Sequence, residues 1–330
     1  MEIAVVILNW NGKALLEQFL PSVVQNSAEA NIYVADNAST DDSIDFLKTH
    51  YPKMGIIRNK INGGFAKGYN DALQELSEDI FILLNSDVEV TPGWLKPIIT
   101  EFQTNPETAA IQPKILDFRK RDYFEYAGAA GGFIDKFGYP YCRGRILNHL
   151  EEDHGQYNDH ARIFWASGAC LAIRKDDFYR AGKFDEDYFA HQEEIDLCWR
   201  LFNLGKDVKF AGNSTVYHLG GGTLNNLQPK KTFFNFRNSL YSLLKNVPGK
   251  RIYFLIFSRL ILDGIAGIKF ILERKPKHAL AIIQAHFSFY KNFRRMLNKR
   301  LQLSKKGKYY EKTSVLYSYY ILQKKKYSEL

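Results

Sequence analysis

An unbroken apolar segment that runs into an Asn-Ser-Asp cluster is the feature that most constrains the fold. Residues 80–84 (IFILL) have no polar face, so both sides of the segment must be covered, as in a central strand of a parallel sheet. Asn85 and Asp87 follow directly. A carboxylate at the carboxyl end of such a strand can hold a divalent cation against a phosphate. Asn and Asp are also common turn residues, so the cluster alone leaves both interpretations open.

Three further strands are expected before this one, over residues 3–8, 31–35 and 54–58, with helical patterns between them. Strands that alternate with helices at this spacing predict a doubly wound, mostly parallel α/β sheet. The ends of parallel strands meet at one edge, so we expect polar residues and glycines to converge there. The converging set is Asn9, Asn11, Asp36, Asn62, Gly63 and Asp87.

This edge of the sheet suits a nucleotide. It offers one carboxylate for the base or ribose, glycines that let the backbone approach a phosphate, and one carboxylate for a metal. Gly63, Gly64 and Gly68 match a dinucleotide fingerprint weakly. They follow the third strand rather than the first, which argues against a dehydrogenase.

The second half of the chain contains an apolar segment with small residues at its centre. Residues 163–173 enclose Trp165, Ser167 and Gly168. Small residues there let a backbone or a substrate come close. We assign Trp165, Ser167 and Gly168, together with His191, to the acceptor side of a site.

Three acids stand at the start of a predicted helix near residue 193. Glu193, Glu194 and Asp196 complement the helix dipole, or one of them serves as a general base beside His191. His218 follows a predicted strand and precedes the glycine run 220–222. A second metal ligand and a hydrogen-bonded structural histidine are equally open interpretations of it.

The net charge of +9 conceals an acidic body and a basic C-terminal region. Residues 1–228 carry 22 Lys and Arg against 32 Asp and Glu, whereas residues 229–330 carry 23 against 4. Such a basic region implies a polyanion, either nucleic acid or an anionic membrane surface. Residues 252–272 are interrupted by charges and match an amphipathic helix in a bilayer interface better than a membrane span. We favour the membrane over RNA because the apolar face is extensive, and a helical subdomain packed on the body is a further alternative.

The N-terminal segment and the cysteines limit the class of protein to which the chain can belong. The N-terminal apolar run is short and lacks the basic residues of a secretory signal, so we interpret it as the first strand. The three cysteines form no CxxC pair, which argues against a disulfide framework or a zinc site.

Seven motifs occur in an order that resembles the family 2 glycosyltransferases of the GT-A fold, especially their bacterial rhamnosyltransferase-like branch. They are VVILNWNG, VADNASTDDS, NGGFAKGYN, LLNSDV, WASGA, HQEEIDLCWR and VYHLGGGT, within about residues 1–225. The resemblance implies a GT-A domain over residues 1–228, with a mixed, mostly parallel sheet. Residues 1–90 would bind the donor and residues 91–228 would hold the acceptor and the catalytic groups. Residues 229–330 would form a basic helical membrane-associating region.

The resemblance also implies roles for donor-binding and metal-binding residues. Asp36 matches the acid that contacts the nucleoside. A donor-binding turn and helix match residues 62–70, which include Asn62, Gly63, Gly64 and Asn70. Asn85 and Asp87 match the metal-binding DxD motif, with Asp87 as a ligand of Mg²⁺ or Mn²⁺. Asn85 replaces the first Asp of that motif, which makes the site less anionic.

For catalysis, the resemblance places Glu194 where the family has the Asp that acts as the base, and it makes His218 a metal ligand. Glu is one methylene longer than Asp, so Glu193 and Asp196 remain alternatives to Glu194. The expected reaction is inverting transfer of a sugar from a nucleoside diphosphate donor to an acceptor hydroxyl. Asn9 and Asn11 complete the expected donor site.

We expect the enzyme at the cytoplasmic face of the plasma membrane, in cell-surface polysaccharide or lipopolysaccharide synthesis. The donor would be a dTDP- or UDP-sugar, with rhamnose as one candidate, and the acceptor a lipid-linked or polysaccharide hydroxyl. One alternative is a sugar nucleotidyltransferase, but residues 9–13 (NWNGK) are a poor version of its phosphate loop. The other is a sugar-, nucleotide- or RNA-binding protein without turnover, which Asn85 leaves open.

Overall fold

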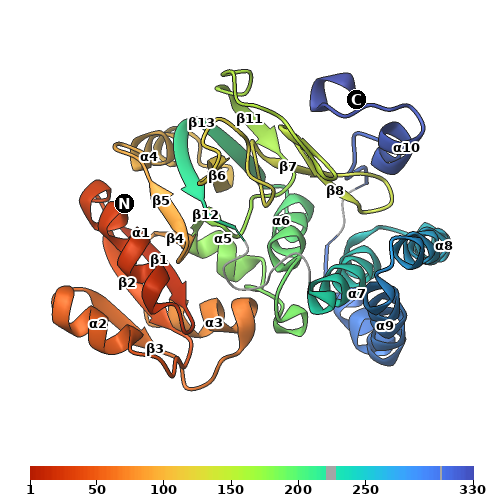
Figure 1. The fold of residues 1–330 in the computed structure, drawn as a ribbon. Helices are drawn as coiled ribbons and strands as arrows, with labels where there is room; N and C mark the ends of the chain where they lie inside the picture. The colour runs from red at the N-terminus through yellow and green to blue at the C-terminus, as the bar shows by residue number, and fades with distance from the viewer. Residues whose placement is uncertain (221–227, 305–306) are drawn as a thin grey trace.

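A mixed sheet forms the centre of the molecule. The computed structural model describes residues 1–220, 228–304 and 307–330. In this part of the chain the strand order is β11-β13-β6-β12-β4-β1-β2-β3, and β5 pairs with β13 (Figure 1). The strands are β1 (Ile3–Asn9), β2 (Asn31–Asp36), β3 (Gly55–Arg58), β4 (Ile80–Asn85), β5 (Val88–Val90), β6 (Thr108–Asp117), β11 (His160–Ile163), β12 (Cys170–Arg174) and β13 (Asp207–His218).

The N-terminal half of the sheet is parallel, as the sequence predicts. β1 pairs in parallel with β2 and β4, and β2 with β3. The register sets Asn9 opposite Asp36 and Leu8 opposite Asn85, so these strands end at one edge. β12 runs antiparallel to both β4 and β6. The prediction of a mixed, mostly parallel sheet is therefore confirmed.

Helices cover both faces of this sheet because each buries an apolar stripe against it. α1 (Lys13–Asn26), α2 (Ser43–His50) and α4 (Leu95–Thr104) pack on one face. α3 (Gly64–Leu73), α5 (Lys175–Arg180) and α6 (Glu193–Asn203) pack on the other. The apolar residues of β4 are buried on both sides, which explains why the segment has no polar face.

A second, antiparallel sheet lies beside α6 and the C-terminal helices. Its strands are β7 (Gly132–Ile134), β8 (Pro140–Cys142), β9 (Arg145–Ile146) and β10 (His149–Leu150). Trp165 packs so closely on Gly132 that a Cβ there would lie 2.0 Å from the indole ring. Only glycine allows this approach.

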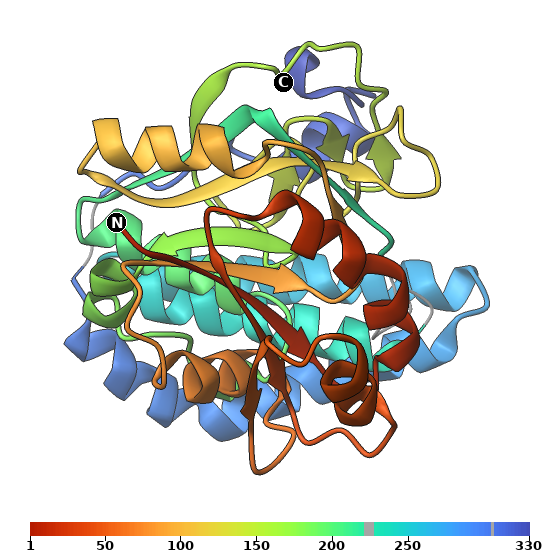
Figure 2. The ribbon, with the colours of Figure 1, turned by 90° about the vertical axis from the view of Figure 1, so that its left-hand side faces the viewer.

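The C-terminal region is helical and packs on the body. It contains α7 (Pro229–Asn246), α8 (Arg251–Leu272), α9 (Pro276–Gln302) and α10 (Val315–Tyr320). Figure 2 shows these helices behind the N-terminal strands, on the far side of the molecule. Within the described residues, none of the helices combines the length and the apolar character needed to cross a bilayer.

Buried ion pairs fasten α7 to the body. The Nζ atom of Lys245 lies 2.6 Å from Asp185 Oδ2 and 2.9 Å from Asp196 Oδ2. Arg200 Nε and Asn246 Nδ2 also donate to Asp196, at 2.9 and 2.8 Å. All five side chains are almost completely removed from solvent. Carboxylates buried in this way need a positive charge close by.

We therefore expect Lys245→Met to lower the free energy of unfolding by about 3–5 kcal/mol, because two buried carboxylates lose their shared cation. Urea denaturation followed by circular dichroism measures this change. Lys250→Met, at an exposed position, is the matched control and should stay within about 0.5 kcal/mol of the parent. Equal effects of the two substitutions would show that the buried pair does not hold α7.

Candidate active site

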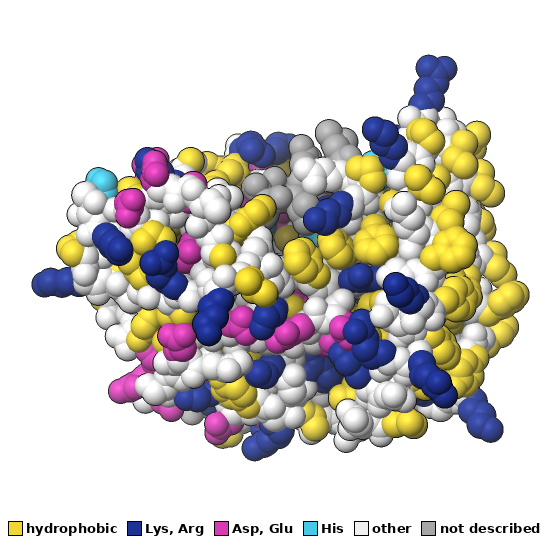
Figure 3. Space-filling model, turned by 90° about the horizontal axis from the view of Figure 1, so that it is seen from below, with side chains coloured by type: hydrophobic (Ala, Val, Ile, Leu, Met, Phe, Trp, Pro, Cys, Tyr) yellow, Lys and Arg dark blue, Asp and Glu magenta, His cyan; other side chains and the backbone are white. Residues whose placement is uncertain are grey.

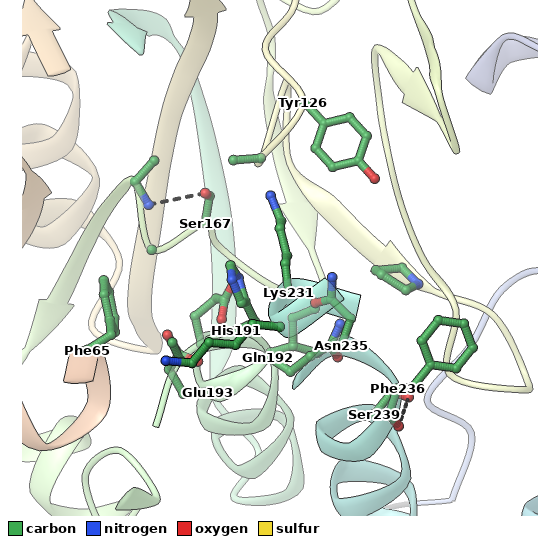
Figure 4. A pocket seen from close by; sticks show the side chains of 18 of the residues that line it. Phe65, Tyr126, Ser167, His191, Gln192, Glu193, Lys231, Asn235, Phe236 and Ser239 are labelled. Atoms are coloured by element: carbon green, nitrogen blue, oxygen red, sulfur yellow. Dashed lines mark hydrogen bonds between the residues drawn. The ribbon is translucent and has the colours of Figure 1, made fainter. Parts of the chain in front are cut away.

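A cavity of about 950 Å³ extends from the ends of the parallel strands to the C-terminal helices. At one end it is lined by Asn11, Asn37, Asn62, Gly64, Asn85, Asp87 and His218. Its middle is lined by Trp165, Ser167, Gly168, His191, Gln192, Glu193, Glu194 and Lys231, several of which appear in Figure 4. At the far end it is lined by α8 and α10, through residues such as Lys269, Phe270 and Tyr320.

Asp87 and His218 meet at the strand end of the cavity. The His218 Nε2 atom lies 3.2 Å from Asp87 Oδ1, and its Nδ1 atom lies 3.2 Å from Glu125 Oε2. Asn85 Nδ2 lies 3.4 Å from the same Nε2 atom. The register of β5 against β13 produces this contact, because it sets His218 opposite Val88, the neighbour of Asp87.

The charge state of His218 follows from these carboxylates. Burial alone opposes a charged imidazole, but Glu125 and Asp87 outweigh it and raise the pKa of His218 to about 10. Without a metal ion, the protonated imidazole supplies the positive charge between the two carboxylates. A divalent ion would compete with this proton for the same Nε2 lone pair.

One carboxylate and one imidazole fit a divalent cation that takes its remaining ligands from a diphosphate and water. Mg²⁺ and Mn²⁺ accept such oxygen-rich sets, completed by substrate phosphates. Among the described residues no cluster of three or more His, Cys, Asp or Glu side chains could hold a metal. The donors present therefore suit an ion that arrives with a phosphate-bearing ligand better than a permanently caged ion.

Beside this end, the loop before α3 provides an amide-lined wall. Asn37 Nδ2 donates to Asn62 Oδ1 at 3.0 Å and to the Gly64 carbonyl at 3.1 Å. The Gly64 backbone has φ of +76°, and a Cβ there would lie 2.4 Å from the Phe189 carbonyl oxygen. Asn62 and Gly64, both predicted donor-site residues, thus line the cavity, whereas Gly63 does not.

Other predicted donor residues lie behind the cavity wall. Asn9 and Asp36 do not line it, and Asp36 is 2% exposed. Asp36 Oδ2 accepts the Ser39 N–H at 3.1 Å, and Asn9 Nδ2 contacts Asp36 Oδ1 at 3.4 Å. These bonds order the loop after β2. Asn11 does line the cavity, and its Oδ1 atom accepts the Thr40 N–H at 2.7 Å.

Asn70, a predicted donor-site residue, has its side chain between α3 and the segment before α6. Its side chain bridges α3 to the segment before α6, donating to the Phe184 carbonyl at 2.9 Å and accepting from the Phe184 N–H at 3.1 Å. It is buried and does not line the cavity. The motif match correctly placed the helix, but it could not show that this side chain faces away from the cavity.

The three candidate acids of α6 occupy two different environments. Glu193 and Glu194 line the cavity, and one carboxyl oxygen of each is buried without a hydrogen-bond partner among the described residues. Asp196 faces the opposite way and is bonded to Lys245, Arg200 and Asn246. Asp196 is therefore a poor candidate for the base, since its carboxylate is fully engaged and does not reach the cavity.

The pKa values of these three carboxyl groups also differ. Burial raises the pKa of Glu194 to about 7, although backbone N–H groups at the start of α6 oppose the rise. Burial and the neighbouring Glu194 charge raise the pKa of Glu193 well above its ordinary value. Asp196 differs, because Lys245 and Arg200 outweigh its burial and lower its pKa. A carboxyl group with a pKa near neutrality is suited to proton transfer at physiological pH.

A strained turn leads into α6. Phe189, His191 and Gln192 have φ values of +64°, +67° and +74°, which non-glycine residues rarely adopt. Asn238 of α7 holds the turn by donating to the carbonyls of Tyr188, Ala190 and His191. Burial and the charge of Lys231 lower the pKa of His191 to about 4, so its imidazole is neutral.

On the predicted acceptor side, the Trp165–Ala169 segment forms a tight wall between β11 and β12. Trp165 is fixed by its indole N–H, which donates to the Phe133 carbonyl at 2.9 Å. The Ser167 hydroxyl accepts the Ala169 N–H at 3.2 Å (Figure 4). Gly168 lies against Phe65, where a Cβ would be 2.9 Å from the ring. All three predicted residues line the cavity.

Sequence reasoning missed several residues that line the cavity or contact its lining. Glu125 contacts His218, but it stands in an irregular segment with no motif. Lys231 reaches into the cavity from α7 (Figure 4), although the sequence assigned it only to a basic region. Asn37 follows Asp36 directly, so its position at a strand end could have identified it. Gly221 and Gly222 of the predicted glycine run lie outside the described residues.

Comparisons with known proteins agree with this geometry. The sequence model described as "Glycosyl transferase family 2" matches residues 4–180. The N-acetylglucosaminyl-diphospho-decaprenol L-rhamnosyltransferase of Mycobacterium tuberculosis (strain CDC 1551 / Oshkosh) is 26% identical over 233 residues, covering 65% of this chain and 75% of the relative.

Two solved structures share the fold at low sequence identity. Residues 1–349 of S. aureus TarS, in complex with UDP-GlcNAc, superpose with a TM-score of 0.56 at 14% identity, over 92% of each chain. GalNAc-T7 with UDP, GalNAc and Mn²⁺ gives a TM-score of 0.55 at 17% identity. That match covers 66% of this chain and 43% of the GalNAc-T7 chain.

We expect Glu194→Gln to stabilise the protein at pH 8 by about 1–3 kcal/mol. The folded pKa of about 7 exceeds the ordinary value of 4.5. The unfolded state therefore ionises first as the pH rises, and this disfavours folding increasingly from about pH 4.5 to 7. Thermal unfolding between pH 4 and 8 tests this, with Glu152→Gln at a half-exposed surface loop as control. A gain at pH 4 equal to that at pH 8 would contradict the burial argument.

Proposed function

Because the chain belongs to glycosyl transferase family 2, we propose that it transfers a sugar from a nucleoside diphosphate donor to an acceptor hydroxyl, with inversion at the anomeric carbon. One observation carries the proposal: a continuous cavity joins the Asp87 and His218 pair to the carboxyl groups of Glu193 and Glu194. The first pair suits a diphosphate with its cation, and the second suits removal of a proton.

Asp87 and His218 are the residues that would hold a divalent cation. When bound, such an ion offsets the negative charge that develops on a departing diphosphate. The GalNAc-T7 structure contains Mn²⁺ together with UDP, which supports a metal of this kind here. Glu125, on the other side of the imidazole, would orient the ring toward the ion through the Nδ1 contact.

Glu194 is the proposed general base. It would take the proton of the acceptor hydroxyl while that oxygen attacks the anomeric carbon and the bond from this carbon to the diphosphate oxygen breaks. The carboxylate becomes a carboxylic acid, the new glycosidic bond forms, and the diphosphate leaves with the electron pair. Glu194 suits the role better than Glu193, because it is the less buried of the two and lines the same cavity.

Lys231 gives the middle of the cavity a positive charge. Burial lowers the pKa of its ammonium group, whereas Glu125 raises it. We propose that this group attracts the anionic donor into the cavity. His191, neutral beside it, offers a hydrogen-bonding ring without adding a second charge.

For the donor we propose a dTDP- or UDP-sugar, with rhamnose as one candidate. Support comes from the rhamnosyltransferase relative and from the neighbours in complex with UDP and UDP-GlcNAc. For the acceptor we propose a lipid-linked or polysaccharide hydroxyl in cell-surface glycan synthesis. The name of that relative describes a diphospho-decaprenol acceptor, which supports the lipid-linked form.

The first experiment is a donor screen. Purified protein is incubated with Mg²⁺ or Mn²⁺ and a panel of nucleotide sugars, and the released nucleoside diphosphate is measured. We expect release from one donor, and loss of that release in Asp87→Asn because a cation ligand is gone. Asp45→Asn, on the exposed start of α2, is the matched control and should retain full release.

Other outcomes separate the alternatives. If a donor binds but no nucleoside diphosphate is released, even after candidate acceptors are added, the protein would instead be a binding protein without turnover. The replacement of the first Asp of the DxD motif by Asn85 leaves this alternative open. Release that is unchanged in Asp87→Asn or by chelation would remove the metal from the proposal.

The proposed base predicts a specific kinetic defect. Glu194→Gln should lower kcat by about 10²–10⁴-fold with little change in donor affinity, because the amide cannot accept the proton. The parent rate should rise with pH up to about 7 and then level off, since the base acts when ionised. Glu193→Gln is the neighbouring comparison, and a larger kcat defect there would transfer the role to Glu193.

A further inference from the structure

The helix α8 separates the cavity from an exposed apolar surface. Its inner face lines the far end of the cavity, whereas its outer face has no covering element among the described residues. We propose that this outer face, with those of α9 and α10, docks on an anionic lipid bilayer and brings the far end of the cavity to the headgroup region. We refer to it as the docking face.

The docking face contains a continuous apolar stripe on α8. Phe254, Phe257, Ile261, Ile265, Ile268 and Leu272 follow one another at intervals of three or four residues, so they share one side of the helix. Each of them is more than half exposed, and Leu272 reaches 79%. The helix has 22 residues and the stripe runs from Phe254 to its end at Leu272, so the stripe is about 27 Å long.

The neighbouring elements extend this stripe. On α9, which runs back along α8, Leu280, Ile283, Phe287 and Tyr290 are exposed at the same helical spacing. Tyr320, Ile321 and Leu322 are exposed at the end of α10. Figure 3 shows hydrophobic side chains gathered along this edge of the molecule, with Lys and Arg around them. Apolar patches of this extent on a monomer mark an interaction surface.

The charges around the docking face are positive. Arg274 and Lys277 stand at the turn between the helices, and Lys291 and Arg294 continue the exposed side of α9. The acids of α8 and its C-cap are neutralised within the fold. Asp263 is buried and pairs with Arg259, and Glu273 pairs with Lys269. An apolar stripe bordered by cations is the pattern of a helix that lies in an anionic bilayer interface.

This charge favours a bilayer over a second copy of the chain. Arg274, Lys277, Lys291 and Arg294 are exposed at the border of the docking face, so they would repel one another if two such faces were placed together. Anionic headgroups would instead attract the same side chains, while the acyl chains would receive the aromatic and aliphatic side chains.

The inner face of α8 gives this docking a functional consequence. Ala266, Lys269 and Phe270 of α8, with Leu316 and Tyr320 of α10, line the far end of the cavity. The apolar side chains that would enter the bilayer therefore lie on the same two elements as this end of the cavity. If the proposed function holds, an acceptor anchored in the bilayer would reach the carboxyl groups of α6 from this end.

Vesicle flotation tests the docking face directly. The full chain is mixed with vesicles of phosphatidylcholine containing phosphatidylglycerol, and with vesicles of phosphatidylcholine alone. We expect binding to the anionic vesicles, weakened by salt. The double variant Ile261→Asp with Ile265→Asp should reduce binding by about tenfold or more, because two charged groups replace apolar ones.

The matched control adds the same charge elsewhere. Val24 and Leu204 are exposed apolar residues on α1 and at the end of α6. The double variant Val24→Asp with Leu204→Asp should bind the anionic vesicles within about threefold of the parent, since only long-range repulsion acts. Equal losses in both variants, or no binding by the parent, would overturn the proposal. Light scattering measures whether the chain forms a dimer. If the parent and the control variant were dimers and the Ile261→Asp, Ile265→Asp variant were not, the docking face would bind a second copy of the chain.

A fluorescent label locates the membrane contact. Cys142, Cys170 and Cys198 are buried, so an added surface cysteine can be labelled selectively with an environment-sensitive dye. Labels at Ile268→Cys and Leu322→Cys should shift to the blue on anionic vesicles, and a label at Val24→Cys should not. A shift at Ile268 without one at Leu322 would disprove docking through α10. Donor hydrolysis by each variant reports separately on the proposed function, because it requires no membrane.

Discussion

Lys245 carries a buried positive charge on which the arrangement of the whole C-terminal region depends. It lies between Asp185, in the segment before α6, and Asp196, within α6. Burial opposes both carboxylates, but Lys245 outweighs it, with Lys299 for Asp185 and Arg200 for Asp196, and lowers their pKa values. Desolvating these charges is costly unless each has its partner in place, so only a narrow range of orientations of α7 against α6 is stable.

The ion pair between Lys245 and Asp196 explains why the pKa values of acids on one turn of α6 are shifted in opposite directions. Asp196 is ionised and fully bonded on the side of α6 that faces α7. Glu193 and Glu194 lie on the side that faces the cavity, where burial raises their pKa values. The structural acid thus positions the helix, and its neighbours keep the unsatisfied oxygens that proton transfer requires. Burying these carboxyl oxygens without partners lowers the stability of the fold, but it leaves the oxygens available to react.

The same fixed arrangement couples the two ends of the cavity. Asp87 and His218 are held by the pairing of β5 with β13, at the edge of the rigid sheet. The far end is formed by α8 and α10, and Arg259 of α8 donates to the Phe137 carbonyl of the loop after β7 and to Ser239 of α7. A surface on the outside of α8 is therefore connected, through packed elements, to the side chains proposed to act in catalysis. Docking on that surface would orient the cavity as well as the helix.

Much of the framework could be predicted from the sequence, because strand identity and direction depend on local patterns. The apolar run of residues 80–84, the alternation of strands and helices, and the polar residues at strand ends predicted the parallel half of the sheet and the convergence of Asn11, Asn62 and Asp87. The local sequence also predicted a helix that begins near residue 193, where α6 starts at Glu193. The charge contrast identified a distinct basic region before any contact was known.

The direction and environment of individual side chains were decided only by the tertiary structure. Asn70 and Asp196 have the residue types expected of a site, yet each faces a distant segment, near residues 184 and 245, instead of the cavity. Glu125 and Lys231 carry no motif, yet Glu125 contacts His218 and Lys231 lines the cavity because remote elements pack there. A local pattern specifies which face of a strand or helix is buried. The acidity and role of a residue depend on partners that may be more than a hundred positions away, and only folding brings those together.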